Sequence, residues 1–177
     1  WYAGTTLEKD AATKVLVSQD QIFCNDRSAS STQTAAWTSA GADYYYGAYG
    51  RLISNKAPIL TCPTESDKFT VNTSNGNGAL TYPVGLITAD EVAMAGGVNV
   101  SSNSSYYLYT NQIYWSGSPC NFNSGSSVVG GFRVISSGSV AVSGVDYYYG
   151  GGRPVVSLSS KAKLSGSGTY NDVYRVS

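Results

Sequence analysis

The stretch VDYYYGGGRPVVSL, residues 145–158, combines the features from which we predict the fold of this chain. Three consecutive tyrosines, residues 147–149, lead into three glycines, residues 150–152, and then into an Arg-Pro pair. The β-branched run that follows, residues 155–158, predicts a core strand that begins after a proline, where no ladder donor is lost. The glycines predict a turn that places the tyrosines just before the start of that strand. The cluster is typical of a recognition surface; half-buried packing residues are the alternative interpretation.

The composition limits the classes of function that the chain can serve. Its 177 residues suit one domain with a sizeable core, and we expect residues 1–177 to form a single ligand-binding domain. Charged residues make up 12%, with 11 acids balancing 11 bases, which argues against a nucleic-acid partner. The 20 glycines and 15 tyrosines, with many Ser and Asn, indicate short strands, many turns and an uncharged polar surface. Such surfaces are typical of extracellular binding proteins.

The titratable residues give little support to an enzyme or a metal site. The chain has no histidine, which removes the commonest general base and metal ligand. Cys120 therefore lacks a histidine to activate it, and no GxSxG motif occurs. The aspartates are scattered, without an EPN or WND triplet, so calcium binding is unsupported. We expect no catalytic activity and no cofactor.

The three cysteines predict one disulfide and one free thiol. They lack CxxC spacing, so a zinc site is not expected. Cys24 follows a short apolar run and Cys62 ends one, which places both at edges of the core. We therefore predict a Cys24–Cys62 disulfide and a free Cys120. No segment reads as a signal peptide or a membrane span, and we interpret the chain as trimmed from a longer exported protein.

Two helices are expected within an otherwise β-rich chain. Residues 5–18 have threonines that can cap a helix, acids in the first turns and apolar residues at three-to-four spacing. Thr88 and Glu91 form a capping-box pattern that predicts a second helix to about residue 95. Short β-prone runs separated by Gly, Ser and Asn predict a small twisted antiparallel sheet with long irregular loops.

A short internal echo links two parts of the sequence. Residues 43–51 read DYYYGAYGR and residues 146–153 read DYYYGGGR. One short match is weak evidence for a repeat, so we interpret the echo as shared local composition.

Several motifs together resemble a domain of exported, often pilin-like proteins of gut Firmicutes and related bacteria. They are CNDRS (24–28), NGNGALTYPVGLITADEVAMAGG (75–97), YLYTNQIYWSGSP (107–119), GGRPVVSL (151–158) and LSGSGTYNDVYRVS (164–177). In that family the YW-S-SP motif and the G-x-RPV-SL strand recur near the C-terminus. The resemblance covers nearly all of the chain and implies an extracellular location on the cell surface.

A more distant resemblance is to the formylglycine-generating-enzyme type of C-type lectin fold. LITADEVAMAGG (86–97) resembles its helix and GGRPVVSL its closing strand, but the catalytic cysteine pattern has no counterpart. The resemblance therefore implies the α+β scaffold and not the activity. Variable proteins of diversity-generating retroelements use the same scaffold, and residues 101–152 are rich in the Asn, Tyr, Ser, Asp and Gly that such diversification yields. General Tyr/Ser/Asn richness is the alternative explanation.

From these features we predict a ligand surface of aromatic and amide side chains. Its ligand would be a protein or a glycan on another cell or phage surface, recognised as an adhesin or variable receptor does. The alternative is a structural pilin or surface-layer subunit whose tyrosines mediate self-association. Arg153 could clamp a ligand, stack on Tyr148 or pair with Asp146. The predicted surface comprises Tyr106, Tyr107, Tyr109, Asn121, Asn123, Asp146, Tyr147, Tyr148, Tyr149 and Arg153.

Overall fold

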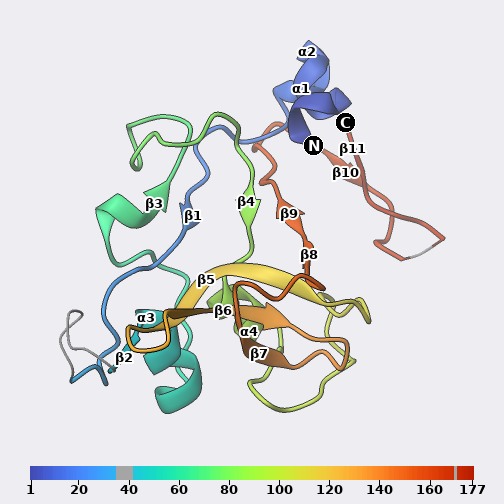
Figure 1. Cartoon of the computed structure of the whole chain (residues 1–177). Helices are drawn as coiled ribbons and strands as arrows, with labels where there is room; N and C mark the ends of the chain where they lie inside the picture. Colours follow the sequence, from blue (N-terminus) through green and yellow to red (C-terminus); the bar gives the residue numbers. More distant parts are fainter. Residues whose placement is uncertain (35–41, 170) are drawn as a thin grey trace.

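The computed structural model describes residues 1–34, 42–169 and 171–177. It is a mixed α/β structure, mostly sheet, with short helices and a curled antiparallel sheet (Figure 1). The helical elements are η1 (Tyr2–Gly4), α1 (Thr6–Lys9), α2 (Ala11–Lys14), α3 (Gly47–Tyr49), the π-helix η2 (Gly50–Asn55), η3 (Glu65–Asp67) and α4 (Ala89–Met94). The strands are β1 (Phe23–Cys24), β2 (Asp43–Tyr45), β3 (Lys68–Phe69), β4 (Gly85–Leu86), β5 (Tyr114–Asn123), β6 (Val128–Val134), β7 (Val140–Gly144), β8 (Gly151–Gly152), β9 (Pro154–Val155), β10 (Leu164–Ser165) and β11 (Arg175–Val176).

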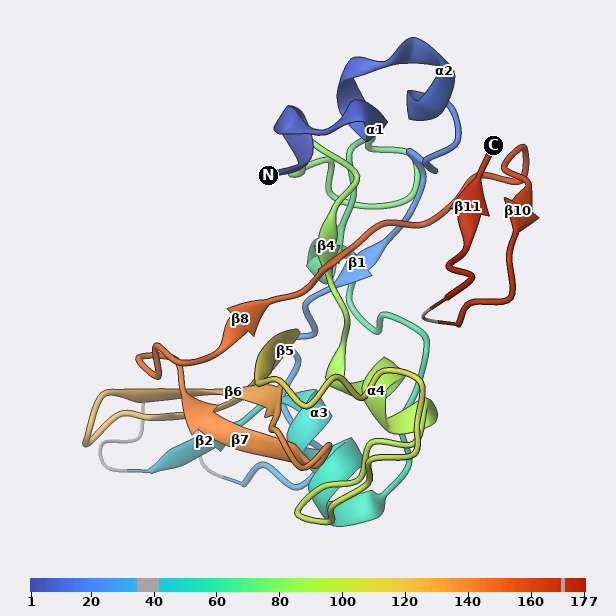
Figure 2. The same cartoon turned by 90° about the vertical axis from the view of Figure 1, so that its right-hand side faces the viewer.

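The main sheet has the order β2-β5-β6-β7, with each neighbouring pair antiparallel and β8 parallel to β5. The pairing of β5 with β6 shifts register on both sides of Pro119, which lacks a ladder donor. Such irregularities increase twist, so they account for the curl of the sheet. Figure 2 shows α3 and α4 beside this sheet, with β1 and β4 leading from it toward the N-terminal helices.

The core lies between the sheet and the helices α3, η2 and α4. Alternate residues of β6 face inward, so Phe132 and Val134 are buried while Arg133 between them faces the opposite side. Below, the face that carries Arg133 is called the outer face of the sheet. The buried cluster comprises Ala48, Leu52, Ala89, Val92, Tyr106, Leu108, Tyr114, Cys120, Phe132, Val134 and Val140.

The second predicted helix is confirmed, together with its capping box. Thr88 Oγ1 accepts a hydrogen bond from the Glu91 amide at 3.1 Å, and Glu91 Oε2 accepts from the Thr88 amide at 2.7 Å. These bonds satisfy amide groups that a helix start otherwise leaves unpaired. Ala89 and Val92 then pack into the core, which fixes the helix against the sheet.

The prediction of one continuous helix over residues 5–18 is wrong. The backbone of Asp10 is extended, with φ −92° and ψ 122°, and it separates α1 from α2. Its side chain accepts a hydrogen bond from the Thr13 amide at 3.0 Å, so Asp10 starts a new helix instead of continuing the old one. Val15, on the predicted apolar face, remains 57% exposed. Without packing along that face, the intrinsic helix propensity of the segment does not suffice to form one continuous helix.

The predicted turn at residues 150–152 and the predicted core strand at 155–158 also need correction. Gly151 and Gly152 form β8 and pair with Tyr114 and Trp115. The segment after them is shorter than expected as a strand, because β9 pairs with β4 over two residues and Leu158 only bridges to Val17. The polypeptide there leaves the sheet and runs along β4 toward the N-terminal helices (Figure 1).

The predicted disulfide is confirmed: Cys24 and Cys62 are joined, with their Cα atoms 5.6 Å apart. Cys120 is a free, buried thiol, and its burial raises the pKa to about 12. A buried thiol in an apolar setting is a packing residue and a poor nucleophile.

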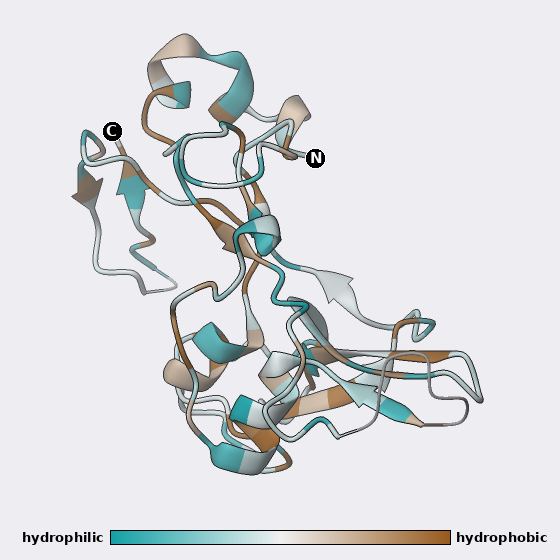
Figure 3. Ribbon diagram, turned by 90° about the vertical axis from the view of Figure 1, so that its left-hand side faces the viewer, coloured by the Kyte–Doolittle hydropathy of each residue, from teal (hydrophilic) through white to brown (hydrophobic). Residues whose placement is uncertain are grey.

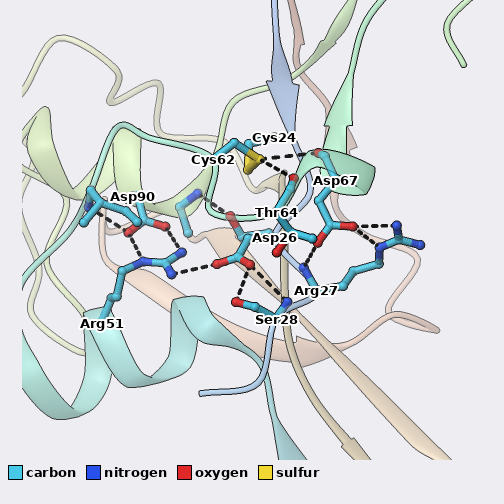
Figure 4. Close-up of polar contacts among 12 residues, drawn as sticks. Cys24, Asp26, Arg27, Ser28, Arg51, Cys62, Thr64, Asp67 and Asp90 are labelled. Carbon is cyan, nitrogen blue, oxygen red and sulfur yellow. Dashed lines mark hydrogen bonds and ion pairs between the residues drawn. A yellow bond between two sulfur atoms is a disulfide. The ribbon is translucent and has the colours of Figure 1, made fainter. Parts of the chain in front are cut away.

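A buried ion-pair network joins three separate segments next to the disulfide (Figure 4). Arg51 donates from Nε and Nη2 to the two carboxylate oxygens of Asp90 at 2.8 and 2.9 Å, and from Nη1 to Asp26 at 2.7 Å. Asp26 also accepts two bonds from Ser28. Because both carboxylates are almost fully buried, this network fixes η2 against α4 and against the segment after β1.

The C-terminal hairpin lies apart from the sheet. Strands β10 and β11 pair with each other, and Figures 1 and 2 show them beside the N-terminal helices. Figure 3 shows both hydrophobic and hydrophilic colouring along the hairpin. Leu164, Val173 and Tyr174 are each more than half exposed there.

Candidate ligand-binding surface

An exposed tyrosine cluster lies between β7 and β8 of the main sheet. We call residues 147–149 the aromatic loop. Tyr148 and Tyr149 are 79% and 64% exposed, and their ring centroids lie 4.1 Å apart. Their hydroxyl oxygens are 2.6 Å apart and share a hydrogen bond. Tyr147 contacts Tyr149 edge to face at 5.4 Å. The three rings therefore support one another while presenting large aromatic faces to solvent.

The outer face of the sheet supports this loop. Trp115 and Arg133 are cross-strand partners on β5 and β6, so they lie on the same face. The Arg133 guanidinium carbon lies 3.8 Å from the centroid of the Tyr147 ring, a close cation–π contact. Gly150 lies so close to the Trp115 indole that a Cβ there would overlap it. The aromatic loop is thus fixed to the sheet through Tyr147 and Gly150.

Arg153 does not belong to this cluster. Its Nη1 donates to the Leu108 carbonyl at 2.6 Å, and its guanidinium lies 4.9 Å from the Tyr114 ring centroid. These contacts stand in place of the predicted ones with Tyr148 and Asp146. Arg153 connects the turn before β5 to the start of β9, so its role in the structure is packing.

The three tyrosines before β5 have different environments. Tyr106 is a core residue whose hydroxyl donates to the Gly138 carbonyl at 3.0 Å, and its burial raises the pKa to about 12. Its prediction as a surface ligand residue is therefore wrong. Tyr107, the next residue, is 80% exposed. Tyr109 packs partly against the core, and its hydroxyl contacts the Asn111 side chain.

Asn121 and Asn123 lie at the far end of β5 from Trp115. Asn121 lies six positions after Trp115 along the strand, about 20 Å of extended chain. Asn123 donates to the Asp43 carboxylate at 2.9 Å and thereby fixes β2 to the sheet. Both asparagines therefore lie where β5 pairs with the edge strand β2, and the structure does not bring them to the aromatic loop. Asp146 is exposed and immediately precedes the loop.

Sequence reasoning missed Arg133 as a member of the cluster. The available signal was the alternation Phe132-Arg133-Val134, which places Arg133 on the face opposite the core. The alignment of Arg133 with Trp115 depends on the register of β5 and β6, which the local sequence does not specify.

A recess lies near the disulfide. A cavity of about 510 Å³ is lined in part by Asp26, Arg51 and Asp90, together with Leu86 and Val155. The Asp26, Arg51 and Asp90 charges in its wall already bind one another in the network of Figure 4. Because these groups are satisfied within the fold, the recess offers a ligand less than the aromatic loop does.

The exposed groups of the aromatic loop are aromatic faces and phenol hydroxyls. Exposed aromatic faces and phenol hydroxyls bury apolar area at low entropic cost and still donate and accept hydrogen bonds. Within the described residues, no group of three or more His, Cys, Asp or Glu side chains is arranged to hold a metal ion. None of the helices described by the structure is long and apolar enough to cross a membrane.

Comparison of this chain with protein-family models, with curated proteins and with solved structures finds no match.

Proposed function

We propose that this chain is a surface-displayed ligand-binding domain of the C-type-lectin-like kind, an adhesin or variable receptor. It recognises a protein or glycan through the aromatic loop. The observation that carries this proposal is the exposure of Tyr148 and Tyr149 on a loop that Tyr147 and Gly150 hold against the sheet. Rigid exposed tyrosines that the fold does not need for its core are typical of recognition surfaces.

The rest of the molecule supports this proposal in two ways. A disulfide is favoured in oxidising compartments, which supports an extracellular location. A mixed structure with short helices and a curled antiparallel sheet is compatible with the proposed scaffold. Residues 101–152 include the aromatic loop, so targeted diversification of this region would change the exposed rings of Tyr148 and Tyr149.

The test is a Tyr148→Ala, Tyr149→Ala double variant screened on glycan and bacterial-surface arrays beside the unmodified protein. We expect the variant to keep its melting temperature and to lose binding at least tenfold. Tyr174→Ala is the matched control, because Tyr174 is 61% exposed but lies on the C-terminal hairpin. Equal binding by all three proteins would refute the proposal. Tyr107→Ala then tests whether the turn before β5 extends the surface.

A structural subunit is the second candidate, and the C-terminal hairpin is the observation that favours it. A two-stranded hairpin is marginally stable alone, and Leu164, Val173 and Tyr174 leave apolar area exposed on this one. Packing of these residues against another copy would cover that area. Sedimentation over a hundredfold range of concentration distinguishes the candidates. A monomer throughout favours the binding domain, whereas assembly that Tyr174→Ser weakens favours the subunit.

A further inference from the structure

Arg133 is the starting point for a more specific inference about the ligand. Its Nε and Nη1 atoms are buried, and neither has a hydrogen-bond acceptor within the part of the chain that the structure describes. The Tyr147 ring covers the guanidinium at 3.8 Å. A cation–π contact stabilises the charge but provides no acceptor for the N–H groups. A buried guanidinium with unpaired donors is costly in free energy.

Other arginines of the chain show what such a group ordinarily contacts. Arg51 binds Asp90 through the edge formed by Nε and Nη2, with both bonds shorter than 3.0 Å. Because each donor meets a different oxygen of Asp90, this is the planar two-point pairing of guanidinium with carboxylate. Arg27 also binds a carboxylate through Nε and Nη2, and both of its bonds are accepted by Oδ1 of Asp67. Arg133 Nε, which belongs to the same edge, lacks an acceptor among the described residues, and a carboxylate from outside the chain would supply one.

The surroundings of Arg133 define what else the ligand must carry. Trp115 lies beside it on the outer face, and Tyr148 and Tyr149 extend the aromatic surface from Tyr147 to solvent. Aromatic faces contact the C–H faces of a sugar ring well, and the paired Tyr148 and Tyr149 hydroxyls can bond to its hydroxyl groups. This combination favours an acidic sugar over an acidic peptide.

We propose that Arg133 anchors the carboxylate of an acidic sugar, such as a uronic acid, after the Tyr147 ring rotates off the guanidinium. The inference rests on the proposed function of the aromatic loop and specifies its ligand. Tyr147 is half-buried and packs on Arg133 and Tyr149, so its rotation leaves the core residues of the sheet in place. The close contact of Gly150 with Trp115 still holds the loop against the sheet. In the ligand-free protein the Tyr147 ring covers the guanidinium. In the complex the ring moves aside, and the carboxylate accepts from Nε in the plane of the guanidinium.

The experiment is a titration of the ¹⁵N-labelled protein with glucuronate, glucose and acetate, observed through arginine Nε–H signals at about pH 6. The Arg133 signal is identified by its loss in Arg133→Lys. We expect glucuronate to shift this signal saturably, glucose to leave it unchanged, and acetate to bind at least tenfold more weakly. No saturable shift with glucuronate, an equal shift with glucose, or equal affinity for acetate would overturn the proposal.

Variants complete the test. Arg133→Lys keeps the positive charge but removes the planar guanidinium and its N–H donors. We therefore expect at least a tenfold weaker affinity for glucuronate, measured through the Tyr148 and Tyr149 signals. Arg153→Lys is the matched control and should bind as the unmodified protein does. Unchanged affinity in a folded Arg133→Lys variant would overturn the inference.

These experiments distinguish a failure of the acidic-sugar inference from a failure of the proposed function. If array binding depends on Tyr148 and Tyr149 but glucuronate does not shift the Arg133 signal, the recognition surface stands and the acidic-sugar ligand is wrong. If glucuronate binds at Arg133 but the double tyrosine variant keeps all array binding, the proposed function of the loop is wrong.

Discussion

Residues 43–51 and 146–153 both contain DYYYG followed by an arginine, yet the structure uses them in opposite ways. The first segment forms β2, α3 and the start of η2, and its Arg51 lies in the buried ion-pair network. The second forms the aromatic loop and β8, with two of its tyrosines mostly exposed. The difference teaches that tertiary context determines the role of such a segment. Both segments pair with β5 through their backbone, but the first also receives two buried carboxylates, Asp26 and Asp90, for its arginine. In the second, Tyr148 and Tyr149 lie on a loop outside the strands and stay exposed.

The largest expected difference between the segments concerns their arginines. Arg51→Met leaves Asp26 and Asp90 buried without their cation, so we expect a loss of about 3–5 kcal/mol in the free energy of unfolding. Arg153→Met loses one hydrogen bond and one cation–π contact, about 1–2 kcal/mol. Urea unfolding of both variants measures the difference. Equal losses would show that the network at Arg51 does not fix the first segment.

The disulfide should matter nearly as much, and chiefly to the first segment. It lies two residues from Asp26 in the sequence and closes a loop with a sequence separation of 38, so Cys24→Ser with Cys62→Ser should cost about 3–4 kcal/mol. Hydrogen exchange should rise more over residues 43–51 than over residues 146–153. A uniform rise across both segments would contradict this assignment.

Thiol accessibility provides a related test. Under denaturing conditions without reductant, we expect one reactive cysteine, Cys120, because the other two are joined. In the native protein at pH 8 even that thiol should not react, since burial raises its pKa to about 12. Three reactive cysteines in denaturant would show that the disulfide is absent.

The smallest effect expected concerns alkaline pH. In the first segment, burial and then the hydrogen bond to Asp43 raise the pKa of Tyr45 from 10.0 to about 12. The folded state therefore favours the neutral phenol. This contribution to stability is complete below about pH 10 and is lost as the pH rises through 12. Tyr45→Phe should flatten the decline of stability between pH 9 and about 11.5, measured by urea unfolding; an unchanged slope would contradict the prediction.

Sequence reasoning succeeded where the signal was local. The capping box at Thr88 and Glu91 specifies a helix start through hydrogen bonds between neighbours, so α4 could be predicted. The disulfide followed from apolar runs that end at Cys24 and Cys62. Sequence reasoning failed where a distant or a competing interaction determined the structure. Asp10 broke the predicted N-terminal helix by capping a new one.

The candidate site was predicted in part for the same reason. Residues 147–149 were identified by composition, and the structure shows two of these tyrosines exposed. Tyr106 could not be distinguished from Tyr107, because neighbours on a turn point in different directions and the core receives one of them. Arg133 was missed since its place beneath Tyr147 depends on sheet register and on the path of the loop.

Urea unfolding of two triple variants tests the central claim most directly: that residues 147–149 are dispensable for the fold. Replacing Tyr44, Tyr45 and Tyr46 with Ala removes half-buried rings that pack on one another and on Tyr49, and we expect a loss of about 4 kcal/mol or more. Replacing residues 147–149 with Ala removes two mostly exposed rings and one cation–π contact, and we expect a loss of about 1–2 kcal/mol with the same denaturant dependence. Equal losses, or an unfolded second variant, would show that the aromatic loop is part of the core and would contradict its assignment as a recognition surface.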